Sequence, residues 1–254
     1  MAKGRLEGRR VLILGASVGI GKATAKAIAA EGARVALAAR RRDVLADAVA
    51  EVGAGAIGIA CDVADEGDCE RVVRETADAF GGLDAVVYAP GITLFGEIAD
   101  MDARAWRTTF DVNVVGATLV TRAAIRHLEA SRGKVVYFSS VTIDDRPPRF
   151  AMAPYVASKH ALEAVAQAWQ GEHPDVSFST IAIGDTRSEK AEVVEEHVLT
   201  DYVPRWVAAG LMPGRLMEAE SVAEQVVNVL ASRENVRRLT ITPVAPREGE
   251  GELA

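Results

Sequence analysis

The feature that most constrains this 254-residue chain is a regular alternation of short apolar runs with longer helical patterns. The runs contain little polar interruption, which is typical of strands buried on both faces of a parallel sheet. They cover residues 11–14, 35–39, 56–60, 85–88, 135–138, 178–183 and 239–242. The helical patterns between them cover residues 21–31, 42–51, 69–80, 103–130, 154–171 and 219–232. This alternation predicts right-handed crossovers and an α/β, doubly wound parallel sheet of about seven strands, with helices on both faces.

The chain is expected to form one domain over residues 1–246, because α/β folds of this length commonly do. Residues 185–217 interrupt the alternation with a mostly helical pattern. Segments inserted after the carboxyl end of a strand lie over the ligand crevice in such sheets, so we predict a small helical substrate lid here. The tail, residues 247–254, is rich in glycine and charge and is predicted to be disordered.

Composition excludes several classes of function. The 29 basic and 36 acidic residues give a net charge of −7, which disfavours nucleic-acid binding. The basic and then apolar start imitates a signal peptide, but three glycines interrupt it, and no other run approaches the ~18 apolar residues of a membrane span. We therefore expect a cytoplasmic protein without a membrane partner. The four histidines and the two cysteines, Cys61 and Cys69, lack metal-ligand spacing, so no metal is predicted and the thiols are expected to be reduced.

A glycine turn follows the first run, with the sequence Gly15-Ala-Ser17-Val18-Gly19-Ile20-Gly21. Glycine permits the positive φ angles and the close backbone approach of a tight turn. The free N–H groups of the helix that follows can bind a pyrophosphate. The turn therefore predicts a dinucleotide site in a Rossmann-type fold, although its spacing differs from the common Gly-x-Gly-x-x-Gly fingerprint.

The end of the second run indicates which dinucleotide binds. A carboxylate there would hold the adenosine ribose of NAD, but the sequence has Ala39 followed by Arg40, Arg41 and Arg42. Guanidinium groups bind a 2′-phosphate through charge-assisted hydrogen bonds, whereas cations at a helix start oppose the helix dipole. We therefore expect NADP(H), with NAD(H) as the less favoured cofactor.

A second group of residues indicates proton transfer. Tyr155 and Lys159 are four positions apart in a helical pattern, so they lie on one face. A nearby ammonium and a nicotinamide cation would lower the pKa of the phenol and make it an acid or base near neutral pH. Ser140 follows the fifth run, where ligand contacts gather. Asn113 is a poor helix former inside a long helical pattern, which indicates a polar task.

Together these residues resemble the short-chain dehydrogenases/reductases over nearly the whole chain. The resemblance is carried by Gly15-x-x-x-Gly19-Ile-Gly21, Cys61-Asp62-Val63, Gly82-Leu-Asp84, Ala89-Pro90-Gly91, Asn113, Ser140 and Tyr155-x-x-x-Lys159. It implies that Ser140 polarises the substrate oxygen, Tyr155 exchanges the proton, Lys159 binds the nicotinamide ribose and lowers the tyrosine pKa, and Asn113 holds a relay water. It also implies cofactor contacts from Asp62, Val63, Ala89, Pro90, Gly91, Gly184 and Thr186.

The chain departs from the family pattern at several positions. Leu14 stands where threonine is usual, and Tyr88-Ala89-Pro90-Gly91 replaces Asn-Asn-Ala-Gly. In the family this threonine bonds near the first part of the Asn-Asn-Ala-Gly run, so both partners of one polar contact are replaced together. An apolar contact between the two positions is compatible with this change. Residues 144–150 lengthen the stretch between Ser140 and Tyr155. Within them, Arg146 and Arg149 are interpreted as parts of a solvated loop in preference to contacts for an acidic substrate. Thr142 is the alternative to Ser140.

The leading hypothesis is an NADP(H)-dependent reductase of ketones or aldehydes, or the reverse dehydrogenase. The alternative is a non-catalytic NADP-binding regulatory or partner-binding protein on the same fold. An apolar pocket wall is expected from Leu94, Phe95, Met152, Trp206, Leu211 and Met212. In the family the helices at residues 103–130 and 154–171 commonly pair across a two-fold axis, so a homotetramer or homodimer is expected.

Overall fold

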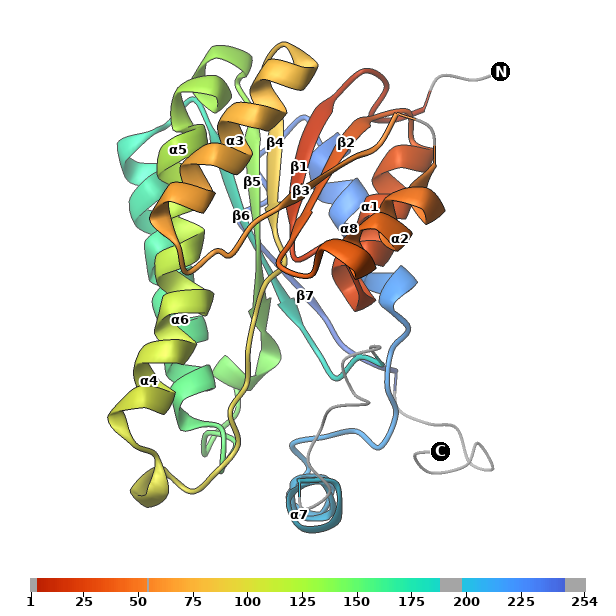
Figure 1. Cartoon of the computed structure of the whole chain (residues 1–254). Helices are drawn as coiled ribbons and strands as arrows, with labels where there is room; N and C mark the ends of the chain where they lie inside the picture. Colours follow the sequence, from red (N-terminus) through yellow and green to blue (C-terminus); the bar gives the residue numbers. More distant parts are fainter. Residues whose placement is uncertain (1–3, 54, 188–197, 245–254) are drawn as a thin grey trace.

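The computed structural model describes residues 4–53, 55–187 and 198–244 (Figure 1). Seven parallel strands form one sheet in the order β3-β2-β1-β4-β5-β6-β7. The strands are β1 (Arg10–Leu14), β2 (Arg34–Ala39), β3 (Ile57–Ala60), β4 (Ala85–Tyr88), β5 (Lys134–Ser140), β6 (Ser177–Ile183) and β7 (Arg238–Ile241). The predicted doubly wound sheet is confirmed, with small shifts at the strand ends. The predicted disordered tail lies outside the described residues.

Helices cover both faces of the sheet (Figure 1). One layer holds α1 (Gly19–Ala30), α2 (Arg42–Val52) and α8 (Ala219–Ala231), and α1 packs closely against α8. The other layer holds α3 (Glu66–Phe80), α4 (Ala103–Phe110), α5 (Gly116–Ser131) and α6 (Ala153–Glu172). The short helix α7 (Val203–Ala208) lies apart from both layers, beyond the carboxyl ends of the strands. Within the lid predicted over residues 185–217, residues 188–197 lie outside the described residues, and we call residues 198–217 the lid segment.

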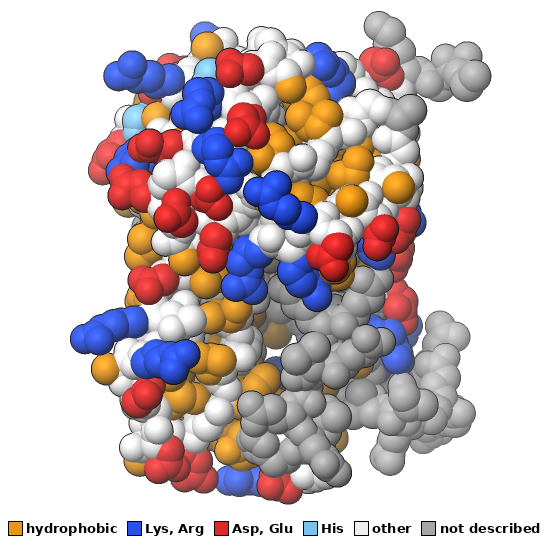
Figure 2. Space-filling model, viewed as in Figure 1, with side chains coloured by type: hydrophobic (Ala, Val, Ile, Leu, Met, Phe, Trp, Pro, Cys, Tyr) orange, Lys and Arg blue, Asp and Glu red, His pale blue; other side chains and the backbone are white. Residues whose placement is uncertain are grey.

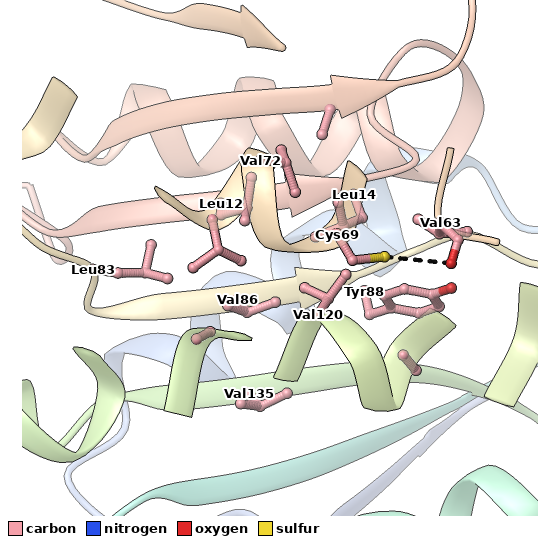
Figure 3. Close-up of a cluster of buried hydrophobic side chains, with 14 of the residues drawn as sticks. Leu12, Leu14, Val63, Cys69, Val72, Leu83, Val86, Tyr88, Val120 and Val135 are labelled. Carbon is pink, nitrogen blue, oxygen red and sulfur yellow. Dashed lines mark hydrogen bonds between the residues drawn. The ribbon is translucent and has the colours of Figure 1, made fainter. Parts of the chain in front are cut away.

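The strand side chains alternate between two buried clusters, one on each face of the sheet. In β1, Leu12 and Leu14 belong to the cluster under α3 and α5, which Figure 3 shows. Val11 and Ile13 belong to the cluster under α1 and α8. Successive side chains of a strand point to opposite faces, so a strand covered on both faces must be apolar at every position. This explains why the runs lack a polar alternation.

A π-helical turn interrupts the long helix expected at residues 103–130. The turn, η2, covers Asp111–Val115 and joins α4 directly to α5. The Gly116 N–H donates to the Asp111 carbonyl, five residues back instead of four. The hydroxyl of Tyr88 in β4 donates to the Val112 carbonyl at 2.5 Å, which stabilises the wider turn. π-Turns of this kind often mark functional sites, and this one carries Asn113.

Two features of the surface concern the other predicted partners. No helix in the described ranges is long and apolar enough to cross a membrane. On the face drawn in Figure 2, acidic and basic side chains are interspersed. A mixed surface of this kind provides no basic stripe for a nucleic-acid backbone on that face.

Candidate active site

A cavity of about 140 Å³ opens where the strand order reverses, between β1 and β4. Ligands of open α/β sheets bind at such a switch point, outside the carboxyl ends of the strands. The wall is lined by Gly15, Ser17, Val18, Ala38, Ala39, Arg40, Arg41, Cys61, Asp62, Val63, Pro90, Gly91, Ile92 and Val112. Nine of the predicted cofactor residues are therefore gathered in one cavity, together with residues from the ends of β2, β3 and β4.

The glycine turn leaves space that side chains would otherwise fill. Gly15 has a φ of +72°, and a Cβ on it would lie 2.9 Å from the Pro90 nitrogen. A Cβ on Gly21 would lie 2.2 Å from the Gly15 carbonyl oxygen. Helix α1 then begins at Gly19, and its N-cap residue Val18 makes no side-chain capping hydrogen bond. The N–H groups at a helix start in a glycine cradle fit the pyrophosphate of a dinucleotide.

The adenosine end of the cavity carries arginines and no carboxylate at the β2 terminus. Arg40 and Arg41 are exposed and line the wall beside Ala39. Asp62 and Val63 lie opposite, where Asp68 accepts a hydrogen bond from the Asp62 backbone N–H at 2.9 Å. The contribution of Asp68 was missed by sequence reasoning, and its early position in α3 is the only signal for it. The β2 end of the cavity wall therefore carries two guanidinium groups.

The departures at Leu14 and Tyr88 form a buried contact. The two residues are direct partners in the β1–β4 pairing and are 0% and 1% exposed. Both lie in the apolar cluster of Figure 3, and Tyr88 also meets the Tyr137 ring edge-on at 6.5 Å. Burial raises the pKa of Tyr88 well above its ordinary value, so this phenol stays protonated. An apolar contact therefore replaces the family's polar one and leaves the neighbouring turn in place.

Tyr155 and Lys159 lie together near the start of α6. The Lys159 Nζ is 5.6 Å from the centre of the Tyr155 ring and donates to the Phe138 carbonyl at 2.7 Å. Lys159 is 3% exposed, so its ammonium is held in a buried position. The i, i+4 spacing thus produces the juxtaposition that the sequence predicts.

The pKa of Tyr155 moves in the opposite direction to the sequence expectation. Burial raises it above its ordinary value, while the hydroxyl of Ser140 and the charge of Arg149 lower it and the charge of Asp185 raises it. Desolvation penalises the phenolate more than these neighbours stabilise it. A phenol in this state is protonated at neutral pH and is suited to donate a proton.

Ser140 and Thr142 form a pair beside the tyrosine. Ser140 Oγ accepts hydrogen bonds from the Thr142 N–H at 3.3 Å and the Thr142 Oγ1 at 3.0 Å. A hydroxyl oxygen accepts through two lone pairs, so its own proton remains for a further partner. The Ser140 side chain also lowers the pKa of Tyr155. The neighbouring Ser139 Oγ is buried without a hydrogen-bond partner among the described residues.

Asn113 is completely buried and joins three elements. Its Oδ1 accepts from the Ile92 N–H at 2.9 Å, and its Nδ2 donates to the Ile92 carbonyl at 3.0 Å. The same Nδ2 donates to Ser158 Oγ at 2.9 Å, and Ser158 donates to the Tyr155 carbonyl at 2.7 Å. Asn113 therefore fixes both the loop after β4 and the start of α6. Ser158, inside the Tyr-x-x-Ser-Lys run, was missed by sequence reasoning.

The remaining predicted cofactor residues lie outside the cavity wall. Gly19, Ile20 and Gly21 form the start of α1, and Ala89 precedes the wall residue Pro90. Gly184 and Thr186 follow β6, and the Thr186 hydroxyl donates to the Gly184 carbonyl at 2.8 Å. Thr186 also forms an isolated bridge with Met217.

An apolar cluster adjoins Tyr155 on the side of the lid segment. Met152, Val156, Val198 and Trp206 form its buried part, and Phe95, Phe150, Tyr155, Tyr202, Val203, Leu211 and Met212 pack against it. Five of the six predicted wall residues are therefore together, whereas Leu94 is 38% exposed. Trp206 is held by a hydrogen bond from its Nε1 to the Phe150 carbonyl at 3.1 Å.

The interpretation of Arg149 as part of a solvated loop is wrong. Arg149 is 4% exposed, and its guanidinium pairs with Asp145 at 3.1 Å and with Asp185 at 2.8 Å. It also donates to the Leu211 carbonyl and lies 5.7 Å from the centre of the Trp206 ring. Asp185 and Leu211 are distant in sequence, so no local pattern could have revealed these two partners.

Two further predictions concern metals and thiols. The described ranges contain no group of three or more His, Cys, Asp or Glu residues that could hold a metal ion. Cys61 and Cys69 are free and buried, and Cys69 Sγ donates to the Val63 carbonyl at 3.4 Å (Figure 3). Cys61 lines the cavity wall beside Asp62 and Val63, and Cys69 bonds to the backbone of Val63.

Comparison with known proteins identifies the family. A model of the short chain dehydrogenase family matches residues 9–198. The chain belongs to this family of oxidoreductases. Family members bind a nicotinamide cofactor and act on small molecules, which agrees with the cavity and with the Tyr155–Lys159 pair.

Individual relatives and solved structures give the same assignment. An uncharacterized oxidoreductase of Staphylococcus epidermidis is 29% identical over 92% of this chain and 96% of its own length. The 11-beta-hydroxysteroid dehydrogenase 1A of Arabidopsis thaliana is 33% identical over 88% of this chain, but the match spans only 66% of that protein. A solved short chain dehydrogenase/reductase family protein superposes with a TM-score of 0.78 at 26% identity, covering 94% of this chain and 97% of its own. An alcohol dehydrogenase from Thermococcus sibiricus complexed with 5-hydroxy-NADP shares the fold, with a TM-score of 0.76 at 24% identity, covering 93% and 96% of the two chains.

Proposed function

We propose that this protein is an NADP(H)-dependent reductase that converts a neutral, apolar ketone or aldehyde into an alcohol. The contact between the protonated Tyr155 phenol, Ser140 and Lys159 is the observation that carries the proposal. A purely regulatory cofactor-binding protein would need no buried proton donor beside a polarising hydroxyl. The raised pKa of Tyr155 favours reduction, since the phenol is then ready to donate at neutral pH.

Each group of residues in and near the cavity would contact a different part of the cofactor. The start of α1, from Gly15 to Gly21, would hold the pyrophosphate, and Arg40 with Arg41 would hold the 2′-phosphate. Asp62 and Val63 would contact adenine, and the Ala89-Pro90-Gly91 stretch would line the ribose. Gly184 and Thr186 would contact the nicotinamide end. When bound, the cofactor supplies the hydride from its nicotinamide C4.

The chain's own residues supply orientation and the proton. Ser140 donates its hydrogen bond to the substrate oxygen and polarises the carbonyl. Tyr155 gives its Oη proton to the same oxygen as negative charge develops there. Lys159 would bind the nicotinamide ribose and keep it in position beside Tyr155, while Asn113 fixes the start of α6. Because the side chain of Asn113 is committed to Ile92 and Ser158, a relay water would be held by its backbone carbonyl.

The substrate would lie against the apolar cluster at the lid segment. The rings of Phe95, Phe150 and Tyr202 each lie within about 6 Å of the Trp206 ring. A flat, uncharged carbonyl compound buries apolar area against such a surface. The relatives named as hydroxysteroid dehydrogenases support a search among bulky alicyclic and aromatic ketones.

The test is single-turnover NADPH oxidation by Tyr155→Phe with any carbonyl that the wild type reduces. The substitution removes the transferable proton and keeps the ring, so the rate should fall by about 10²–10⁴ while NADPH still binds. Tyr137→Phe removes a buried phenolic hydroxyl that is bonded to Thr121, so it is the matched control and should keep its rate. A Tyr155→Phe rate within threefold of wild type would mean that another group carries the proton.

We also propose that the chain forms an assembly of identical copies. The ring centres of Trp106 and Phe110 in α4 are 6.4 Å apart, both side chains are half-buried, and Val115 of η2 is 45% exposed. This apolar outer face supports a homotetramer or homodimer formed through α4, α5 and α6. Light scattering should return a mass of two or four chains, and a single-chain mass at micromolar concentration would refute the assembly. The composition supports a cytoplasmic location.

A further inference from the structure

Arg149 makes three hydrogen bonds to three different parts of the chain. Its Nε donates to Asp145 in the loop after β5, and its Nη1 donates to Asp185 after β6. Its Nη2 donates to the backbone carbonyl of Leu211 in the lid segment. These partners are 4, 36 and 62 residues away along the chain. One guanidinium therefore joins two loops at the carboxyl edge of the sheet to the segment that covers them.

The same side chain organises aromatic residues beside the catalytic tyrosine. The Arg149 guanidinium lies 5.7 Å from the centre of the Trp206 ring, and Trp206 packs against Phe95, Phe150 and Tyr202. The neighbouring Arg205 lies over the Phe150 ring at 4.1 Å. A buried guanidinium stacked on an aromatic face is more strongly attracted to it than an exposed one.

The charge of this cluster also acts on Tyr155. Arg149 lowers the pKa of the phenol, while Asp185 and burial raise it. The pKa of Asp145 is raised by burial, against the opposing charge of Arg149. The groups that bear on Tyr155 or on this cluster are Ser140 from β5, Lys159 from α6, Asp144 and Asp145 from the loop, Asp185 after β6 and Arg205 from α7.

We propose that Arg149 is a positioning residue that fixes the lid segment against the catalytic tyrosine, so that the aromatic side of the substrate site is assembled before substrate binds. The inference rests on the proposed reductase function. Three of the guanidinium's five N–H donors are already committed, and two aspartates surround it. Arg149 therefore does not bind an acidic substrate, and the cluster selects against one through the excess carboxylate charge.

Separating charge from geometry requires two substitutions of Arg149. Arg149→Lys keeps the cation but cannot reach both aspartates and the Leu211 carbonyl with one planar fork. We expect KM for a neutral carbonyl substrate to rise about tenfold and the pH profile of kcat to stay in place. Arg149→Gln removes the charge as well, so its KM should rise and the tyrosine limb of the pH profile should move to higher pH.

Asp185→Asn is the third variant, and Arg146→Gln is the control for all three. Asp185 raises the pKa of Tyr155, so Asp185→Asn should move the same limb downward, and combining it with Arg149→Gln should restore part of the shift. Arg146 belongs to the same loop but is exposed, and within the described part of the chain its side chain bonds only to the loop backbone at Ile143 and Asp145. Its substitution should leave both KM and the pH profile unchanged.

A readout without turnover keeps this inference independent of the proposed reaction. Trp206 is 4% exposed, so acrylamide quenches its fluorescence poorly, and the Trp206→Phe variant identifies its share of the signal. Both Arg149 variants should make the Trp206 signal about three times more quenchable, whereas Tyr155→Phe should not. Unchanged quenching with wild-type KM and pH profile in Arg149→Lys and Asp185→Asn would overturn the inference even if Arg149→Gln fails to fold. Increased quenching in an inactive protein would support the inference and refute the proposed function.

Discussion

The cofactor half and the substrate half of the site are built by different means. Around β1, β2 and β4 the cavity depends on backbone: Gly15 and Gly21 permit contacts that a Cβ would block, and α1 presents its N–H groups. Around β5, β6 and the lid segment the site depends on side chains, with Arg149 joining distant segments and aromatic rings filling the space. Backbone constraints leave a short sequence signature, whereas long-range side-chain contacts leave none. The first half is therefore fixed by local sequence and the second by tertiary packing.

Gly21→Ala should have the largest effect in the cofactor half. The new Cβ would meet the Gly15 carbonyl oxygen at 2.2 Å, so the turn must move. We expect a loss of about 1–3 kcal/mol in stability and more than a tenfold loss in NADPH affinity. Gly171→Ala in α6 is the control, because a Cβ there meets nothing within 4 Å, and it should be neutral or stabilising. Thermal unfolding and NADPH fluorescence titration measure both, and equal behaviour of the two variants would break the comparison.

The cofactor preference should change by an intermediate amount. Arg40→Asp replaces a cation at the β2 terminus with the carboxylate that suits a ribose hydroxyl, so NADH should become the tighter ligand. We expect wild type to favour NADPH by about 1–3 kcal/mol, the scale of charge-assisted hydrogen bonds. Arg42→Asp, at the first position of α2 and outside the cavity wall, should leave the ratio unchanged. Equal dissociation constants of wild type for the two cofactors at fixed salt would contradict the preference.

Tyr88→Phe should have the smallest effect and sharpens the comparison. The ring stays beside Leu14 and Tyr137, but the Val112 carbonyl in η2 loses its hydroxyl donor. We expect a loss of about 1 kcal/mol in stability, seen as a Tm lower by about 2–4 °C, with NADPH affinity unchanged. A large loss of cofactor affinity would mean that this side chain, and not only the backbone, shapes the cavity.

How much could be predicted from the sequence also differs between features set by local sequence and features set by tertiary packing. The seven strands were predicted because their runs are apolar at every position, and the glycine turn because its spacing is local. Asn113 was assigned a polar task from its poor helix propensity, yet its partners Ile92 and Ser158 were not identifiable. Arg149 was misassigned because an arginine in a Pro- and Asp-rich loop is usually solvated, and its burial depends on Asp185 and Leu211.

The π-helical turn has a consequence for how this chain tolerates changes in length. A π-turn is equivalent to one extra residue accommodated inside an α-helix, and each residue turns the helix by about 100°. Deleting one residue between Asp111 and Val115 would relax the run 103–131 into a regular helix and rotate one half against the other. Asn113 or the outer face of α5 would then point the wrong way. The extra residue of the π-turn therefore sets the rotation of α5 relative to α4. This rotation lets one continuous helical run direct Asn113 into the site while the outer face of α5 stays at the surface.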